Sequence, residues 1–349
     1  LRFNTQQLGN DMKALVYHGR RDLRMVEQPV PVPKSGEVLL KVTHTGLCQT
    51  QIDEFMEGPF LINAAEHPLT GKKIPMIPGH EFGGVVEKCG PDVDSKWIGK
   101  QVAVLPAQVC GVCPSCRVGK INLCEKLAYQ GLVGVEGGLA EYTLTPAANI
   151  VECRHAHTLT YVEPILCGIH IGKKISRFSS SKKVLVLGAG GLGVATAAVL
   201  SRHYKMDVQI RDVLPARQKR CADAGLKVAS EQDLANKYEV VVDLAGSNHS
   251  NLETPFLESF RYIKPSGLCV LVGTYFHPVP FVPVDITIDI QLPSYSDLQG
   301  VGGWTYLNGG SKGIIVYRKG IDEFVAFDRH SPADVNGSCP LPLYPDEQN

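Results

Sequence analysis

The chain has 349 residues, 44% hydrophobic and 20% charged, a composition typical of a folded protein with room for two domains. Lys plus Arg equals Asp plus Glu at 35 each, and no basic run is present, so the composition favours a small neutral partner over nucleic acid or an anionic membrane. Eleven cysteines are too sparse for a disulfide framework, and the start lacks an apolar signal region, which predicts a reducing, cytoplasmic setting.

The sequence pattern changes along the chain. Residues 1–11 precede Met12 and are interpreted as an extension, and from Met12 to about Asn149 short apolar runs alternate with Gly and Pro, which predicts many short strands. Residues 160–178 read as a connecting helix. From Lys182 apolar strands alternate with amphipathic helices, the pattern of a parallel α/β sheet. The longest uncharged stretch, 184–200, is glycine-rich and too short for a membrane span.

Four cysteines stand close together in "CGVCPSCRVGKINLC". Cys110, Cys113, Cys116 and Cys124 have the spacing C-x2-C-x2-C-x7-C. Two-residue gaps let thiolates converge on one tetrahedral ion, so zinc is the leading candidate. Ferredoxin iron–sulfur patterns usually end with Pro after the last Cys, whereas Glu125 follows here. Four protein ligands close the coordination sphere, so any chemistry must lie elsewhere.

Further metal-ligand residue types are scattered along the chain. They are Cys48 in "GLCQTQID", His80 and Glu81 in "PGHEFGG", and Glu163 and Cys167 in "VEPILCGIH". Such residues converge only through the fold, and spacing alone does not separate a metal site from ordinary core or surface residues.

A glycine-rich motif opens the α/β part. In "VLVLGAGGLG" Gly188, Gly190 and Gly193 follow a predicted strand and begin a helix, the context in which G-x-G-x-x-G binds a dinucleotide pyrophosphate. Asp212 ends the next predicted strand, where a carboxylate accepts hydrogen bonds from the ribose 2′-hydroxyl and repels a 2′-phosphate. NAD is therefore favoured over NADP. A solvated strand-end charge is the alternative for Asp212, and Arg211 leaves room for NADP.

These motifs and "GGLAEYT" occur along the chain in the order found in the zinc-dependent medium-chain alcohol and polyol dehydrogenases. Residues 12–276 resemble that family. The stretch "EGPFLINAAEHPLTGKKIPMIPGHEFGG" is most similar to the butanediol dehydrogenase branch. The resemblance implies an α/β fold with a β-rich GroES-like catalytic domain over residues 12–175 and a Rossmann NAD-binding domain over 176–276. Family members are commonly homodimers or homotetramers.

The resemblance also assigns roles. It implies a structural zinc held by the four clustered cysteines and a catalytic zinc at Cys48, His80 and Glu163, with Glu81 close by and Cys167 as the other possible ligand. The implied catalytic residues are Cys48, Thr50, His80, Glu81 and Glu163. The implied cofactor-binding residues are Gly188, Gly190, Gly191, Leu192, Gly193, Asp212 and Arg217.

The chain departs from the family pattern in three places. Glu163 followed by Pro is the polyol pattern, whereas Cys167 stands where alcohol dehydrogenases place a cysteine ligand. Gln51 replaces the acid that orients the zinc-bound His, and Asp53 replaces the relay histidine.

In the family, the chain returns after the nucleotide-binding domain to complete the catalytic domain with a helix and a strand. The sequence of residues 277–349 shows no such segment. They read as β-rich, with two strands joined at Lys319-Gly320, and resemble the opening half of a small Rieske-like β domain without cluster ligands. We interpret them as an off-family terminus in which His330 and Cys339 have no function.

The expected function is hydride transfer between NAD and a secondary alcohol or vicinal diol, with zinc as Lewis acid. Two alternatives remain. A zinc-free quinone-type reductase is disfavoured by the cysteine cluster and by Cys48 with His80. The other alternative is a catalytically silent zinc- and nucleotide-binding protein. It remains possible because the segment that completes the catalytic domain is not found.

Overall fold

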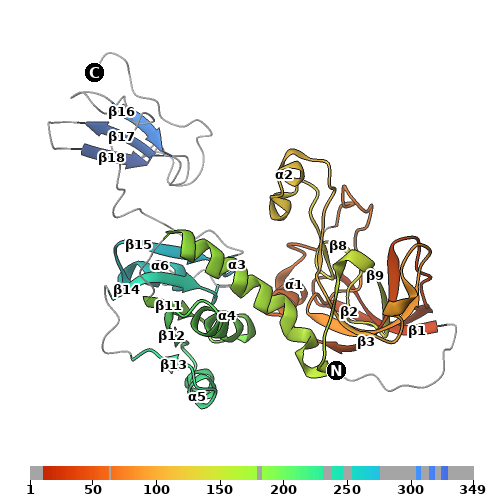
Figure 1. The fold of residues 1–349 in the computed structure, drawn as a ribbon. Coiled ribbons are helices and arrows are strands. Elements are labelled where there is room, and N and C mark those ends of the chain that lie inside the picture. The colour runs from red at the N-terminus through yellow and green to blue at the C-terminus, as the bar shows by residue number, and fades with distance from the viewer. Residues whose placement is uncertain are drawn as a thin grey trace. The chain divides into compact units, whose positions relative to one another are not determined.

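The computed structural model describes residues 11–62, 64–178, 183–230, 237–246, 254–275, 304–307, 314–318 and 324–328. The chain divides into two compact units, Leu1–Pro278 and Val279–Asn349. The predicted extension, residues 1–11, lies outside the described residues except for Asp11, which begins the first strand. The larger unit holds both the β-rich part and the parallel sheet that the sequence predicts (Figure 1).

The β-rich part consists of short strands in three sheets. A hairpin pairs β1 with β2, a five-stranded antiparallel sheet has the order β10-β5-β4-β3-β9, and a small sheet has the order β6-β7-β8. The strands are β1 (Asp11–Gly19), β2 (Asp22–Pro29), β3 (Glu37–Thr45), β4 (Phe82–Cys89), β5 (Gln101–Val104), β6 (Ala107–Gln108), β7 (Ala128–Gln130), β8 (Gly134–Val135), β9 (Tyr142–Pro146) and β10 (Ile150–Glu152). The helical segments are α1 (Gln49–Glu57), α2 (Pro114–Arg117), and the 3-10 turns η1 (Ser95–Trp97), η2 (Ile121–Leu123), η3 (Ala147–Asn149) and η4 (Ala156–Tyr161).

Strand β3 shows why this part folds as it does. Its alternate residues Val38, Leu40 and Val42 are at most 2% exposed and pack with Phe82 in one core. Leu39 points to the opposite face, as the two-residue period of a strand requires, and packs in a second core. Both faces of this inner strand are therefore buried, and it pairs with β4, the strand that follows the candidate ligands His80 and Glu81.

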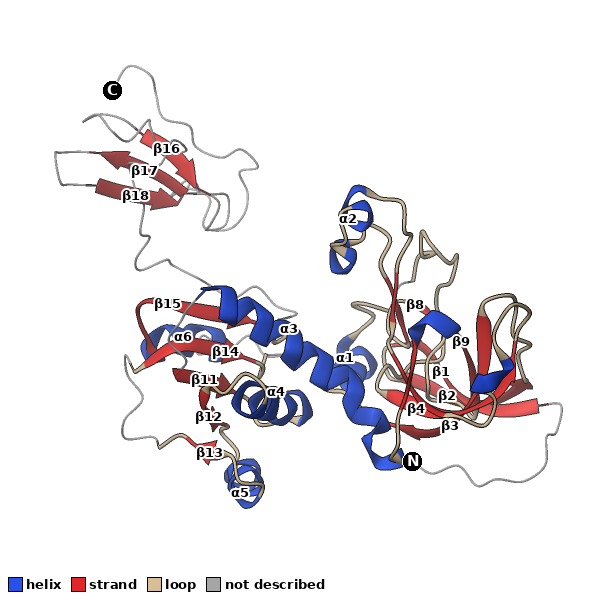
Figure 2. Ribbon diagram, in the orientation of Figure 1, coloured by secondary structure: helices blue, strands red, loops and turns tan. Residues whose placement is uncertain are grey.

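The second part is a five-stranded parallel sheet. Its order is β13-β12-β11-β14-β15, the arrangement of a dinucleotide-binding Rossmann fold, with helices on both faces (Figure 2). The strands are β11 (Lys183–Leu187), β12 (Asp207–Arg211), β13 (Lys227–Val228), β14 (Tyr238–Asp243) and β15 (Ile263–Leu271). The helices are α3 (Val162–Phe178), α4 (Gly191–Arg202), α5 (Pro215–Asp223) and α6 (Pro255–Tyr262).

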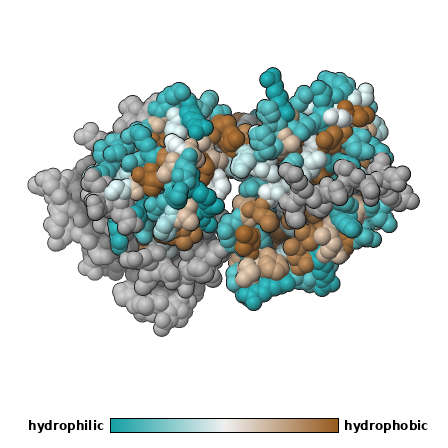
Figure 3. All heavy atoms as spheres, turned by 90° about the horizontal axis from the view of Figure 1, so that it is seen from below, coloured by the Kyte–Doolittle hydropathy of each residue, from teal (hydrophilic) through white to brown (hydrophobic). Residues whose placement is uncertain are grey.

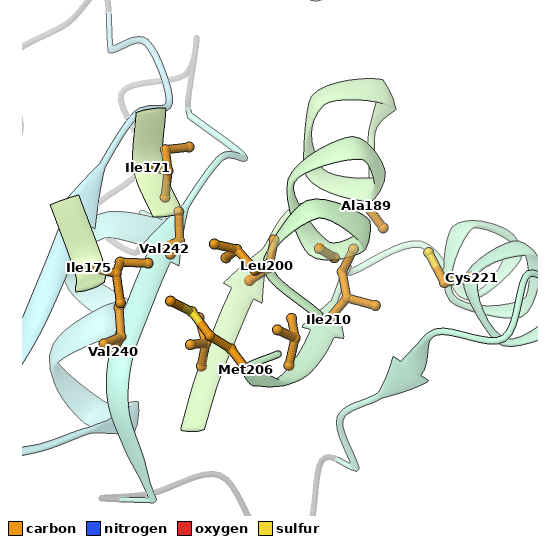
Figure 4. Close-up of a cluster of buried hydrophobic side chains, with 13 residues drawn as sticks. Ile171, Ile175, Ala189, Leu200, Met206, Ile210, Cys221, Val240 and Val242 are labelled. Carbon is orange, nitrogen blue, oxygen red and sulfur yellow. The ribbon is translucent and has the colours of Figure 1, made fainter. Parts of the chain in front are cut away.

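Helices pack against this sheet through a buried hydrophobic core. Ile175 of α3, Leu200 of α4 and Val240 of β14 are all 0% exposed and point toward one another (Figure 4). Leu185 and Val241 face the opposite side and pack against Tyr262 of α6. Because β11 and β14 are buried on both faces, each contains a continuous apolar run, as expected for inner strands of a parallel sheet.

The smaller unit contains an antiparallel sheet of order β16-β17-β18. Its strands are β16 (Trp304–Leu307), β17 (Ile314–Arg318) and β18 (Phe324–Asp328). The two strands predicted on either side of Lys319-Gly320 are β17 and β18. His330 and Cys339 lie outside the described residues, and the off-family interpretation of 277–349 stays a prediction.

Hydrophilic residues cover most of the described surface on the face seen in Figure 3, with hydrophobic residues in small groups between them. Among the described helices, none has the length and apolar character to cross a membrane.

Candidate active site

The four cysteines of residues 110–124 meet in one lobe. Their Sγ atoms all lie within 4.8 Å of one another. Cys113 is the N-cap residue of α2 and Cys124 is the C-cap residue of η2, so two short helical turns position two of the four sulfurs. The backbone N–H of Cys113 donates to Cys110 Sγ, and that of Cys110 donates to Cys124 Sγ, both at 3.4 Å.

The environment favours the thiolate, the form of cysteine that binds metals, at Cys110 and Cys113, whereas burial and the neighbouring thiols raise the pKa of Cys116 to about 12. Hydrogen bonds from the backbone N–H groups of Glu125 and Cys116 lower the pKa of Cys113 to about 6. Similar bonds from Val112 and Cys113 lower the pKa of Cys110. Four sulfur donors satisfy tetrahedral zinc completely, so the lobe fits a structural zinc that leaves no position for substrate.

A second group of ligand atoms forms where α1 meets the start of β4. Cys48 Sγ and the side-chain ligand atoms of His80 and Glu81 lie within 4.8 Å of one another. Gly79 precedes His80 with a φ of 101°, a backbone conformation that favours glycine. A Cβ at Gly46 would collide with the Glu81 carboxylate, so glycine there gives this ligand its space. We call Cys48, His80 and Glu81 the ligand triad.

Helix α1 supplies groups that surround the ligand triad. The Gln51 amide nitrogen contacts His80 Nδ1, and its amide oxygen accepts the Cys48 backbone N–H at 3.1 Å. Gln51, which stands where the family has an acid that orients the zinc-bound His, thus contacts the His80 ring directly. Burial lowers the pKa of His80, which favours the neutral imidazole that ligates metals. Thr50 Oγ1 lies 3.7 Å from Cys48 Sγ.

Asp53, which the resemblance placed at the relay position, also lies on α1. It is 5% exposed, and its carboxylate accepts a hydrogen bond from Gln49 Nε2 at 2.9 Å. Its part in proton transfer stays a prediction.

Glu163 and Cys167 lie one helical turn apart near the start of α3. Glu163 Oε1 accepts a hydrogen bond from the Tyr129 hydroxyl at 2.6 Å and another from the Cys167 thiol at 3.4 Å. Neither residue belongs to the group of atoms that defines the ligand triad. The structure therefore places Glu163 beside the triad and Cys167 beside Glu163.

Burial and neighbouring charges raise the pKa of Glu81, Cys48 and Cys167. Burial, and then the charge of Glu163, raise the pKa of Glu81 to about 7. Burial, and then the charge of Glu81, raise the pKa of Cys48 to about 11. Burial and Glu163 also raise the pKa of Cys167. A cation compensates such crowded anions, and a sulfur, nitrogen and oxygen donor set suits zinc.

Tyr129 is the neighbour of the site that sequence reasoning missed. It lies on β7, 34 residues before its partner Glu163 in the sequence. Its ring also meets that of His80 edge to face, with centroids 5.8 Å apart. No motif marks this tyrosine, and the only local signal is its alternation with the buried Ala128 and Gln130.

The glycine motif adopts the geometry that the sequence predicts. Gly188 follows β11 with a φ of 96°, and Gly190 is the N-cap of α4. A Cβ at Gly193 would collide with the Gly188 carbonyl, so the third glycine permits the close approach of helix and strand. Gly191 and Leu192 form the first turn of α4, where N–H groups attract an anion.

Asp212 follows β12 and is 6% exposed. Its Oδ2 accepts the Ala189 backbone N–H at 2.7 Å, and its Oδ1 accepts that of Leu214 at 2.9 Å. Arg217 Nη1 lies 3.3 Å from Oδ2. The carboxylate is thereby fixed beside the glycine loop. A pocket of about 680 Å³ borders Gly190 and Arg217.

Comparison with known proteins agrees with this geometry. Residues 34–155 match the alcohol dehydrogenase GroES-like domain. The chain is 32% identical over 291 residues to the starvation-sensing protein RspB of Escherichia coli, covering 79% of this chain and 80% of the relative. It is 27% identical over 309 residues to (R,R)-butanediol dehydrogenase of Saccharomyces cerevisiae, covering 79% and 80%. A crystal structure of the E. coli RspB alcohol dehydrogenase with NADH superposes with a TM-score of 0.66 at 27% identity, covering 78% and 80%.

The chain belongs to the zinc-containing medium-chain alcohol and polyol dehydrogenase family. It is a zinc-dependent oxidoreductase that uses a nicotinamide cofactor, with a structural four-cysteine zinc site and a catalytic Cys/His/Glu site.

Proposed function

We propose that this chain oxidises a secondary alcohol or a vicinal diol with NAD and catalyses the reverse reduction of the ketone. The observation that carries the proposal is the convergence of Cys48, from one segment of the chain, with His80 and Glu81, from another, at one partly buried point. The similarity to butanediol dehydrogenase supports a diol among the substrates.

The ligand triad would hold the catalytic zinc, with Glu163 beside it. Bound zinc would act as a Lewis acid that lowers the pKa of the substrate hydroxyl and favours hydride transfer to the nicotinamide. Gln51 keeps the His80 ring oriented through its Nδ1 contact. Thr50, whose hydroxyl lies 3.7 Å from Cys48 Sγ, would accept the proton of the substrate hydroxyl and pass it outward.

The glycine loop and Asp212 would hold the cofactor. The N-terminus of α4 offers backbone N–H groups to the pyrophosphate, and Asp212 offers a fixed carboxylate to the ribose hydroxyls. The negative charge of Asp212 supports NAD over NADP, although Arg217 beside it reduces that repulsion.

The test is NADH formation over a panel of secondary alcohols, vicinal diols and polyols, with binding of NAD measured in parallel. The expected result is saturable NADH formation with at least one diol or secondary alcohol. Binding of NAD and zinc without turnover of any member of the panel would favour the catalytically silent binder instead.

A further inference from the structure

We propose that Tyr129 is a positioning residue whose hydroxyl holds Glu163 beside the ligand triad and so keeps one coordination position of the catalytic metal open. The inference rests on the proposed function, since it concerns the metal that the ligand triad would bind.

The backbone of β7 fixes the place of Tyr129. Its neighbours Ala128 and Gln130 are both 0% exposed, and Gln130 is anchored by hydrogen bonds to Leu144 O at 2.7 Å and from Thr145 Oγ1 at 2.8 Å. The alternation of a strand turns Tyr129 to the opposite face, where its hydroxyl reaches Glu163. The position of the phenol is therefore set by the strand and not by Glu163 itself.

Tyr129 contacts both the ligand triad and the carboxylate beside it. Its ring packs edge to face on the His80 ring, with an interplanar angle of 69°. Its hydroxyl donates to Glu163 Oε1 at 2.6 Å, within the range of a charge-assisted hydrogen bond. Tyr129 therefore contacts one ligand of the triad and restrains a further candidate ligand beside it.

The charges around Glu163 explain why such a restraint matters. A divalent cation held by the ligand triad would also attract the nearby Glu163 carboxylate. The Cys167 thiol donates to the same Oε1 atom at 3.4 Å, a longer and weaker contact. The Tyr129 hydroxyl is thus the stronger of the two groups that keep Glu163 in place.

The experiment uses the full chain with cobalt(II) in the catalytic site, and visible absorption is read as a difference from Cys48→Ala. Azide is the probe of an open position. The cobalt bands of the unchanged chain are expected to shift on addition of azide. In Tyr129→Phe the bands are expected to differ before azide is added, and azide affinity is expected to fall about tenfold or more, because freed Glu163 takes the position.

Two variants make the result specific. Tyr129→Phe with Glu163→Gln is expected to recover the azide response, since an amide is a poor ligand. Tyr238→Phe is the matched control, because it removes a hydroxyl that donates to Gln209 Oε1, also at 2.6 Å, in the parallel-sheet part. It is expected to leave the cobalt spectrum unchanged.

An unaltered spectrum and azide response in Tyr129→Phe would overturn the inference. If Tyr129→Phe does not retain cobalt, Glu163→Gln decides: bands identical to those of the unchanged chain agree with a held-off Glu163, and shifted bands would show that Glu163 is already a ligand. Absence of Cys48-dependent cobalt bands in the unchanged chain would instead refute the catalytic metal site and with it the proposed function.

Discussion

The Gln51 amide nitrogen faces Nδ1 of His80, so a neutral group orients the imidazole of the ligand triad. The amide oxygen of the same side chain accepts the backbone N–H of Cys48, which ties the ring of one ligand to the main chain of another. Partners of metal-binding histidines fix the ring orientation and tune the metal. This arrangement holds two ligands in register without adding a negative charge.

Replacement of Gln51 should weaken the catalytic metal site. Gln51→Ala is expected to lower zinc affinity about 10- to 100-fold, because His80 loses the group that orients it. Competition with a chromophoric chelator measures the change. Gln49→Ala is the matched control, since Gln49 lies on the same helix but hydrogen-bonds Asp53. Equal affinities in both variants would show that Gln51 does not support the ligand.

The four-cysteine lobe should respond differently. Cys116→Ser is expected to remove one of two zinc ions and to lower the melting temperature, because structural zinc binding contributes folding free energy. Metal content by mass spectrometry and thermal unfolding measure the two effects. Cys153→Ser, at a cysteine outside both groups, is the control. Unchanged zinc stoichiometry in Cys116→Ser would refute the structural assignment.

The cofactor preference should depend on Asp212. Asp212→Ala is expected to weaken NAD binding about tenfold or more, because hydrogen bonds to a charged acceptor are lost. NADP binding should fall less, since the repulsion of its 2′-phosphate disappears as well. Fluorescence titration with both reduced cofactors gives the comparison. Equal affinity of the unchanged chain for the two cofactors would contradict the role given to Asp212.

Asp243 should make stability depend on pH. It is 0% exposed, and burial raises its pKa although it accepts the Tyr275 hydroxyl and the Ala245 N–H. The folded protein therefore holds this proton more tightly than the unfolded chain, and the stability it contributes falls as pH rises above the ordinary carboxyl pKa.

Asp243→Asn removes that dependence. Urea unfolding between about pH 4 and about pH 7 should show the variant gaining free energy of unfolding relative to the unchanged chain as pH rises. A difference that stays constant across this range would contradict the assignment.

Local patterns predicted much of the fold and of the zinc lobe. Cys110 to Cys124 span a single short segment, so their spacing alone indicates that they converge. The glycine motif after β11 predicts both the turn at Gly188 and the start of α4, because only glycine satisfies that geometry. Short apolar runs separated by Gly and Pro predicted the strands of the β-rich part, and apolar strands alternating with amphipathic helices predicted the parallel sheet.

Contacts between distant segments could not be read in this way. The Tyr129 hydroxyl reaches Glu163 across 34 residues, and the Tyr275 hydroxyl reaches Asp243 across 32. Neither pair leaves a periodic or motif signal, because each depends on how strands and helices pack. The same applies to Glu81, which joins Cys48 and His80 in the ligand triad while Glu163 lies beside it.

The most direct test of the catalytic zinc site combines zinc content with NADH formation in the unchanged chain and in Cys48→Ala. The unchanged chain is expected to hold two zinc ions and to form NADH from a diol or secondary alcohol. Cys48→Ala is expected to hold one zinc ion, to retain its fold by circular dichroism and to form no NADH. Equal zinc content or equal NADH formation in the two proteins would contradict the catalytic zinc site.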